Sequence, residues 1–365
     1  MIFQLPFIGL RFDMTNPSPI RFAIVGSGAI AKVHAAAITL IPDTRLAAVC
    51  SRNRDSAEVL AAPCGARVFD SPSELAEWDG VDAVLVATPS GVHQDAVLPA
   101  LRSGKPVLCE KPLEISVERV RLLIAEAERT KTILAGFFPL RSGAGAEIIQ
   151  SAIAAGRFGR LTFLSARVKW WRNLEYYGES SWKGTHALDG GGALINQGIH
   201  AVDLLQWIGG RPCEIMAFAS TLAHPGLEME DTIAAALRFE NGALGTIEAA
   251  TSCHPGLDLS LEVSGDCGTA ILVNDRIGYW RFREELPGDE AVRNGESGGE
   301  IRGGASDPGA ITCEGHRRQI VEFCRAIRGE SANVISAREA GISVAIVEAA
   351  YRSAVSKKSE LIDYP

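Results

Sequence analysis

The chain has 365 residues, of which 47% are hydrophobic and 22% charged, a composition typical of a globular protein long enough for two domains. Lys and Arg number 36 against 44 Asp and Glu, so the net charge is −8. This acidic balance argues against nucleic acid or an anionic membrane as the main partner. The eight cysteines show no C-x-x-C spacing, which favours reduced thiols in a cytoplasmic protein and no metal site.

Residues 1–20 are predicted to be an N-terminal tail. The segment has some apolar character, but it contains no basic n-region and no small-residue cleavage site, so we expect no signal peptide. The apolar run Phe22–Val25 is too short to span a membrane.

Between residues 21 and 140, short apolar strands alternate with helical stretches. Continuous apolar strands in this alternation are typical of a parallel sheet that is covered on both faces and joined by right-handed crossovers. The predicted strands are 22–25, 45–50, 83–87, 106–109 and 132–135, and the predicted helices are 29–40, 92–103 and 116–129. We therefore predict a doubly wound Rossmann domain over residues 21–140.

Residues 141–365 have a different pattern, with longer strands and fewer helices. The predicted strands are 161–170, 214–222, 232–239, 243–250, 257–264 and 278–282. Asn241-Gly242 between two of them is a strong hairpin signal. Residues 284–312 are rich in glycine and charge and predict a flexible loop, and two helices are expected over 315–328 and 337–353. We predict a second domain of the α+β class with an antiparallel sheet.

A glycine-rich turn directly follows the first predicted strand. Gly26-Ser-Gly28-Ala-Ile-Ala31 has the pattern G-x-G-x-x-A, in which the first glycine permits a tight turn and the second admits a pyrophosphate. The N-terminus of the following helix adds free N–H groups and a partial positive charge. The predicted dinucleotide-binding residues of this turn are Gly26, Ser27, Gly28, Ala29 and Ile30. An ordinary turn is the alternative.

The end of the second strand bears on the choice of dinucleotide. An acidic residue there would bind the ribose 2′-hydroxyl of NAD, but this chain has Ser51 followed by Arg52. A small hydroxyl and a cation favour the 2′-phosphate of NADP. The alternative is that Arg52 stacks on adenine or faces solvent and that the cofactor is NAD. We expect NADP or NAD, with NADP favoured.

Two further loops follow later strands of the parallel sheet. Thr88, Pro89 and His93 belong to ATPSGVH after one strand, and Glu110-Lys111-Pro112 follows the next. Ligands bind outside the carboxyl ends of such strands, so we expect both loops to face the cofactor. Lys111 is a candidate proton-relay or orienting group. The alternatives are an ordinary surface lysine and, for His93, a residue that only caps a helix.

Four stretches in this order resemble the Gfo/Idh/MocA family of NAD(P)-dependent oxidoreductases: GSGAIA, ATPSGVH, EKP, and GGGALINQGIHAVDLLQW from Gly190 on, preceded by SWKGTHALD. The resemblance covers nearly the whole chain from Arg21. It implies a Rossmann domain followed by an α/β domain with a large open, mainly antiparallel sheet that often forms an oligomer interface. It also implies hydride exchange between a nicotinamide and a hydroxyl-bearing carbon of a sugar, nucleotide sugar or cyclitol, in a homodimer or homotetramer.

The helix after the glycine run carries predicted catalytic groups. Asn196 and His200 are four residues apart and share a helix face, which Asp203 can also approach. A secondary alcohol needs a base for its O–H proton, and histidine suits this near neutral pH. By resemblance, Lys111 is the active-site lysine and His200 the catalytic histidine, while Asn196 stands where many members have aspartate. This departure puts a simple Lys-Asp-His triad in doubt and is similar to the NQGIH form of some nucleotide-sugar 3-dehydrogenases.

The segment 170–189 is rich in Trp and Tyr and is predicted to wall the substrate site, with part of its aromatic stripe in ordinary packing. The predicted substrate-binding residues are Arg141, Trp182, Asn196, Gln197 and His200. Arg141 and Arg172 are candidates for binding an anionic substrate group or for solvated surface charge. His186 is a weaker competitor of His200 for the catalytic role.

These features together predict an NAD(P)-dependent dehydrogenase or reductase that acts on CH–OH groups. One alternative is a dihydrodiol- or aldose-type reductase that uses NADPH, which Ser51 and Arg52 would suit. The other is a non-catalytic dinucleotide-binding regulator, against which the presence of both Lys111 and His200 argues.

Overall fold

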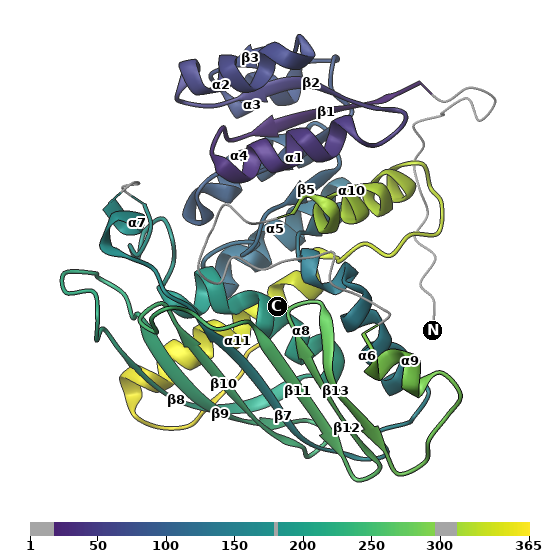
Figure 1. The fold of residues 1–365 in the computed structure, drawn as a ribbon. Coiled ribbons are helices and arrows are strands. Elements are labelled where there is room, and N and C mark those ends of the chain that lie inside the picture. Colours follow the sequence, from purple (N-terminus) through teal and green to yellow (C-terminus); the bar gives the residue numbers. More distant parts are fainter. Residues whose placement is uncertain (1–17, 179–181, 296–311) are drawn as a thin grey trace.

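The computed structural model describes residues 18–178, 182–295 and 312–365. Two sheets form its framework, one of six strands and one of eight (Figure 1). Within the described residues, no helix is long and apolar enough to cross a membrane. Most of the predicted N-terminal tail and much of the predicted loop over 284–312 lie outside the described residues. The described part of that loop contains a short helix, α9 (Asp289–Arg293), which the sequence analysis did not predict.

The first sheet is parallel throughout and has the order β3-β2-β1-β4-β5-β6. Its strands are β1 (Ile20–Val25), β2 (Thr44–Cys50), β3 (Arg67–Phe69), β4 (Ala83–Val86), β5 (Val107–Cys109) and β6 (Leu134–Gly136). All residues of β4 and β5 are buried, as expected for strands covered on both faces. Because β1 lies between β2 and β4, the strand order reverses there, and ligands bind at such a switch point.

Helices cover this sheet, and their N-termini differ in one respect. The helices are α1 (Ala29–Thr39), α2 (Arg54–Ala61), α3 (Pro72–Glu77), α4 (His93–Arg102) and α5 (Val117–Thr130). Side chains of Asn53, Ser71 and Ser116 cap α2, α3 and α5, whereas α1 begins after Gly28 without a side-chain cap. The first N–H groups of α1 therefore lack the side-chain cap that α2, α3 and α5 have, and a ligand can supply a partner.

The second sheet is mainly antiparallel and has the order β13-β12-β11-β7-β10-β9-β8-β14. Its strands are β7 (Leu161–Lys169), β8 (Pro212–Ser220), β9 (Thr232–Phe239), β10 (Leu244–Ala250), β11 (Ser260–Gly265), β12 (Gly268–Val273), β13 (Arg276–Phe282) and β14 (Glu360–Leu361). Only the pair β7–β10 is parallel among these neighbouring described strands. Asn241-Gly242 joins β9 to β10, as predicted. The predicted fold class is confirmed.

Among the described residues, helices line one face of this sheet, the face toward the Rossmann domain (Figure 1). They include α6 (Ala144–Ala154), α8 (Ile199–Gly209) and α11 (Ala337–Ser356). Residues of β9 alternate between buried and exposed, because every second side chain points away from these helices. A late helix, α10 (Glu314–Ile327), returns to the first domain and packs against α1 (Figure 1). The chain thus crosses between the domains again after residue 141.

Candidate functional site

A cavity of about 1150 Å³ lies where the two domains meet. Its wall combines the loops that follow β1, β2, β4 and β5 with residues of the second domain. Fifteen predicted site residues line it: Gly26, Ser27, Gly28, Ala29, Ile30, Ser51, Arg52, Thr88, Pro89, Glu110, Lys111, Trp182, Asn196, Gln197 and His200. Two other predicted site residues, His93 and Arg141, lie outside its wall.

The glycine-rich turn leaves room for a ligand at the start of α1. Gly26 has a φ of +118°, and a Cβ added there would lie 2.3 Å from the carbonyl oxygen of Ala87, so only glycine fits. A Cβ added at Gly28 would meet no atom within 4 Å. Since α1 also has no acidic residue in its first turn, this end of the cavity suits a pyrophosphate.

The end of β2 is neutral and rich in hydroxyl groups. The Ser27 hydroxyl lies 2.8 Å from that of Ser51 and 2.6 Å from that of Ser56. Arg52 is exposed and forms no ion pair with another described residue, whereas Arg54 pairs with Glu58 and Asp70. Arg52 is therefore a cation in the cavity wall that remains available to a ligand.

His93 holds two loops together and does not reach the cavity. Its ring is buried, with Nε2 3.0 Å from the carbonyl oxygen of Thr88 and Nδ1 3.3 Å from that of Leu113. It connects the loop after β4 with the loop after β5. The predicted cofactor contact of His93 is thus corrected: its two ring nitrogens face backbone oxygens, and it acts as a structural residue at the start of α4.

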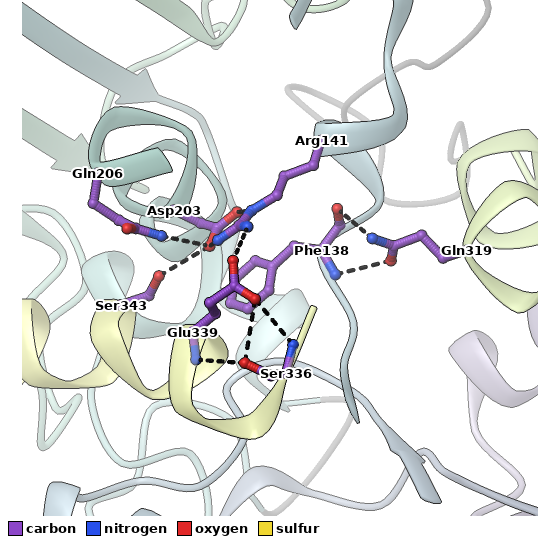
Figure 2. A network of polar contacts seen from close by, with 8 residues as sticks. All are labelled: Phe138, Arg141, Asp203, Gln206, Gln319, Ser336, Glu339 and Ser343. Atoms are coloured by element: carbon purple, nitrogen blue, oxygen red, sulfur yellow. Dashed lines mark hydrogen bonds and ion pairs between the residues drawn. The ribbon is translucent and has the colours of Figure 1, made fainter. Parts of the chain in front are cut away.

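Arg141 is also corrected, because its guanidinium is held by acidic side chains (Figure 2). Nε and Nη2 each donate to the Asp203 carboxylate at 2.7 Å, and Nη1 lies 3.3 Å from Glu339. Asp203 further accepts hydrogen bonds from Ser343 and Gln206. Arg141 and Asp203 are 7% and 1% exposed. Asp203 therefore points to Arg141 instead of approaching the face of Asn196 and His200, and the Arg141 guanidinium is paired outside the cavity wall.

Lys111 meets the second domain at Asn196. The Lys111 ammonium donates to the backbone oxygen of Asn196 at 2.6 Å. The side-chain Nδ2 of Asn196 donates to both carboxylate oxygens of Asp189, at 2.8 and 2.9 Å. Asp189 is buried and also accepts from the backbone N–H of Gly184 at 2.8 Å. Asp189 ends the SWKGTHALD stretch before the glycine run and lies in the segment 170–189 predicted to wall the substrate site, but no individual role was predicted for it.

A buried carboxylate shapes the backbone that carries Asn196. Glu230 accepts hydrogen bonds from the N–H groups of Gly192 and Leu194, at 3.0 and 2.9 Å, and from the hydroxyl of Tyr351. A Cβ at Gly192 would lie 1.8 Å from the Glu230 carbonyl oxygen. The chain then forms a π-helical turn, η4 (Leu194–Gly198), before α8 begins. Such turns are frequent at functional sites, and this one places Asn196 and His200 in the same wall.

The pKa values of His200 and Lys111 are both perturbed by burial. Burial and the charge of Lys111 lower the pKa of His200 to about 3, so the imidazole is neutral at physiological pH. Its Nδ1 is buried without a hydrogen-bond partner among the described residues. Burial also lowers the pKa of Lys111, and the charges of Glu110 and Asp189 partly offset this. A neutral base and a lysine whose proton is easier to lose suit proton transfer.

A second cluster lies behind Lys111 and joins three elements. Glu110 Oε1 is 2.8 Å from His34 Nε2 on α1 and 3.9 Å from His316 Nε2 on α10. Although burial opposes it, the hydrogen bond and charge of His34 help to lower the pKa of Glu110 to about 2. One ligand atom from each residue lies within 4.8 Å of the others, so the cluster could also hold a metal ion. His34 and His316 lie in no motif, and sequence reasoning missed them.

The aromatic segment divides between the cavity and ordinary packing. Trp170, Tyr176 and Trp182 line the cavity, together with the cations Arg172 and Lys183. The other two aromatic residues of the stripe, Trp171 and Tyr177, pack against the His224 ring at centroid distances of 5.7 and 5.2 Å. His186 is exposed and is absent from the cavity wall.

A Rossmann sheet with an open glycine-rich turn, and a lysine and a neutral histidine in the same cavity, define a two-domain dinucleotide-dependent oxidoreductase. The family described as "Oxidoreductase family, NAD-binding Rossmann fold" matches residues 20–137. The GFO/IDH/MocA C-terminal domain matches residues 147–271. The chain belongs to the Gfo/Idh/MocA family, as its motifs predicted.

Relatives of the chain act on sugars and cyclitols. The WlbA dehydrogenase of Bordetella pertussis, solved with NADH and UDP-GlcNAcA, is 31% identical with a TM-score of 0.86, over 95% of this chain and 99% of that one. The D-glucoside 3-dehydrogenase of Escherichia coli is 27% identical over 94% of this chain and 98% of that protein. The inositol 2-dehydrogenase of Rhizobium meliloti is 28% identical over 70% and 76% of the two chains.

Proposed function

We propose that the protein is an NAD(P)-dependent dehydrogenase or reductase that transfers a hydride between a nicotinamide and a hydroxyl-bearing carbon of a sugar, nucleotide sugar or cyclitol. One observation carries the proposal: Lys111 and a neutral His200 line the same cavity as the dinucleotide turn. The substrates named for the relatives support the choice of substrate class.

The residues present suit the cofactor. Gly26, Gly28 and the uncapped N-terminus of α1 would hold the pyrophosphate, and Thr88 and Pro89 would line the path to the nicotinamide end. When bound, the nicotinamide accepts or supplies the hydride. The protein has to orient the substrate carbon and manage the hydroxyl proton.

His200 and Lys111 are the groups that act on the proton of the substrate hydroxyl. In the oxidation direction, the neutral imidazole of His200 takes the hydroxyl proton, and the Lys111 ammonium stabilises the negative charge that develops on the oxygen. In the reduction direction, the same two groups return the proton. Asn196 fixes a neighbouring hydroxyl, and Trp182 and Gln197 lie where they can contact the rest of a sugar.

A turnover screen tests this function against its rivals. The purified protein would be assayed with UDP-GlcNAcA, myo-inositol and a D-glucoside, each with NAD and NADP, and with aldoses and NADPH in the reverse direction. Oxidation of one of the first three substrates is expected. Activity confined to aldoses with NADPH would favour the aldose-type reductase. Dinucleotide binding without any turnover would favour the non-catalytic regulator.

We further propose that the ribose site accepts a 2′-phosphate, which favours NADP. The support is the neutral Ser51 at the end of β2 and the exposed, unpaired Arg52 in the cavity wall. A thermal-shift titration with NAD, NADH, NADP and NADPH measures the preference, because a ligand of the native state raises its stability. Arg52→Ala should weaken NADPH binding by roughly tenfold and NADH binding much less. Equal losses would contradict the proposal and leave NAD as the cofactor.

We also propose a homodimer or homotetramer that associates through the outer face of the eight-stranded sheet. Phe163 on β7 and Leu244 on β10 are register neighbours and are 40% and 47% exposed. Phe218 on β8 is 69% exposed. An exposed apolar patch of this kind is typical of an association surface. Light scattering would measure the molar mass of the wild type and of Leu244→Arg in solution. The wild type should have the mass of a dimer or tetramer, and the variant a lower mass. A wild type with the mass of a monomer would contradict the proposal.

We propose a cytoplasmic location. All eight cysteines are free thiols, and Cys50, Cys109 and Cys324 are buried. This pattern suits a reducing compartment. Cell fractionation with an antibody against the protein would test the location, and recovery from an oxidising compartment would contradict it.

A further inference from the structure

Asp189 is a buried carboxylate whose only side-chain hydrogen-bond donor among the described residues is Asn196. It is 2% exposed, and both of its oxygens lie within hydrogen-bond distance of Asn196 Nδ2. Its remaining donor is the backbone N–H of Gly184, which fixes the carboxylate within its own loop. No arginine or lysine donates to this carboxylate within the described residues. A carboxylate buried without a direct ionic partner costs stability, so its position calls for an explanation in function.

The carboxylate determines which end of the Asn196 amide faces the cavity. An amide has one end that donates and one that accepts, and an ionised carboxylate only accepts. Rotating the amide by half a turn would place its oxygen against the oxygens of Asp189, which is repulsive. Nδ2 is therefore held toward Asp189, and Oδ1 is left for the cavity, whose wall includes Asn196. No described residue donates a hydrogen bond to that oxygen.

Asp189 also supplies negative charge beside Lys111. Asp189 lies seven residues before Asn196 in the chain, at whose position the family resemblance implies aspartate in many members. The charges that face Asp189 are those of Lys111 and Lys183. Its own charge, together with that of Glu110, raises the pKa of Lys111 against the effect of burial. Asp189, from the loop before the helix, thus supplies the carboxylate that a Lys-Asp-His arrangement requires.

We propose that Asp189 is a positioning residue that orients the Asn196 amide and keeps Lys111 charged, so that the substrate must present a hydrogen-bond donor to Asn196. A hydroxyl or an amide N–H meets this requirement, and a carboxylate or phosphate does not. The inference rests on the proposed function, because it assigns a polarity to one part of the same substrate site.

The first test is Asp189→Asn, which keeps the size of the side chain and removes its charge. The second amide can pair with Asn196 in either orientation, so the variant loses the fixed polarity. With the substrate that the wild type accepts, kcat/KM should fall by roughly tenfold or more, while the dissociation constant of NADH stays within about twofold. Monodeoxy analogues of that substrate identify the hydroxyl that contacts Asn196. The wild type should show its largest loss of kcat/KM with the analogue that lacks this hydroxyl, and the variant should show a smaller loss with the same analogue.

The pH profile separates this role from a structural one. Because Asp189→Asn removes a negative charge beside Lys111, the pKa of Lys111 should fall, and the Lys111-dependent limb of kcat/KM should move to lower pH. Glu228→Gln is the matched control, since Glu228 is an exposed carboxylate that binds the backbone N–H of His186 in the same loop and does not contact Asn196. It should leave the profile unchanged. A lower melting temperature with an unshifted profile in Asp189→Asn would overturn the proposal.

A readout without turnover keeps the inference separate from the proposed function. Acetic anhydride labels uncharged lysines, and mass spectrometry measures labelling of Lys111 as a function of pH. The labelling midpoint of Lys111 should lie at lower pH in Asp189→Asn than in the wild type and in Glu228→Gln. If no sugar is oxidised but this shift is seen, the proposed function fails and the charge role of Asp189 stands. If turnover is seen without the shift, the charge role fails alone.

Discussion

Two polar clusters surround helix α8, and they differ in how completely their groups are paired. On one side, Arg141 and Asp203 share two hydrogen bonds, and Glu339, Ser343 and Gln206 complete the network (Figure 2). The second cluster lies on the cavity side and consists of Lys111, Asn196 and His200. In it, His200 Nδ1 has no hydrogen-bond partner within the described residues.

The difference between the clusters indicates two uses of buried polarity. Arg141 comes from the 3₁₀ turn η3 (Pro139–Ser142) just after the last Rossmann strand, and it pairs with acidic residues of α8 and α11, so this paired network anchors the segment after β6 to both helices. Groups with unused hydrogen-bonding capacity lie where a ligand can complete them.

His200→Ala should abolish most of the activity, because it removes the proposed base. A decrease in kcat of roughly 10²–10⁴ is expected for the loss of a general base. NADH binding, measured by fluorescence titration, should be unchanged. His186→Ala is the matched control, since His186 is exposed and outside the cavity wall. Full turnover in His200→Ala would show that another group moves the proton.

Arg141→Met should affect stability instead of chemistry. Breaking a buried ion pair by removing one partner costs about 3–5 kcal/mol, because Asp203 is left buried without its cation. The free energy of unfolding, measured by urea denaturation, should fall by that amount, while kcat/KM of the folded fraction stays near the wild-type value. The double variant Arg141→Met/Asp203→Leu should regain most of the stability. A selective loss of substrate affinity in Arg141→Met would restore the original prediction that Arg141 binds substrate.

The two glycines of the dinucleotide turn should respond differently to alanine. Gly26→Ala should lower the melting temperature, since a strained φ and a contact with Ala87 cost on the order of 1–3 kcal/mol. Gly28→Ala should leave the free protein as stable as the wild type, because its Cβ meets open space. It should nevertheless weaken NADH binding by roughly tenfold, since that space is where the pyrophosphate approaches. Unchanged NADH binding in Gly28→Ala would contradict the predicted position of the cofactor.

The stability of the protein should also depend on Asp189 and pH. Burial raises the pKa of Asp189 to about 6. A raised carboxyl pKa contributes stability that is full below the unfolded value of about 3.9 and is lost as the pH rises through about 6. The melting temperature of the wild type should therefore fall relative to that of Asp189→Asn between about pH 4 and pH 7. Parallel curves for the two proteins would contradict this assignment.

Chelation should have the smallest effect. The sequence analysis predicts no metal, and the hydrogen bond between His34 and Glu110 already pairs two of the three potential ligands. Treatment with EDTA should leave turnover unchanged, and elemental analysis should find no stoichiometric metal. An equimolar metal that is lost together with activity would assign the cluster a catalytic or structural ion instead.

The glycine-rich turn could be located from the sequence, and the contacts in the rest of the candidate site only in part. Gly26 to Ile30 are consecutive, so one turn between β1 and α1 brings them together whatever the rest of the chain does. Lys111 and His200 were found through motifs. Asp189 ended one of the quoted stretches, but its pairing with Asn196 was not predicted, because an aspartate in a loop has no spacing that indicates its partner. Arg141 was misassigned, because a cation near a predicted site gives no indication of the carboxylate that will pair with it.

The sequence by itself determined the class of both domains, the family and most of the strands and helices, although β3, α2, α3, α6, β12 and β14 were not predicted. These features depend on local periodicity and on residues that are close together in the chain. Only the tertiary structure decided which polar groups are paired and which remain available to a ligand. Asp203 pairs with Arg141, 62 residues away, and Glu110 pairs with His34, 76 residues away, because folding brought these elements into contact. The same folding left His200 and Asn196 facing a cavity that no single segment encodes.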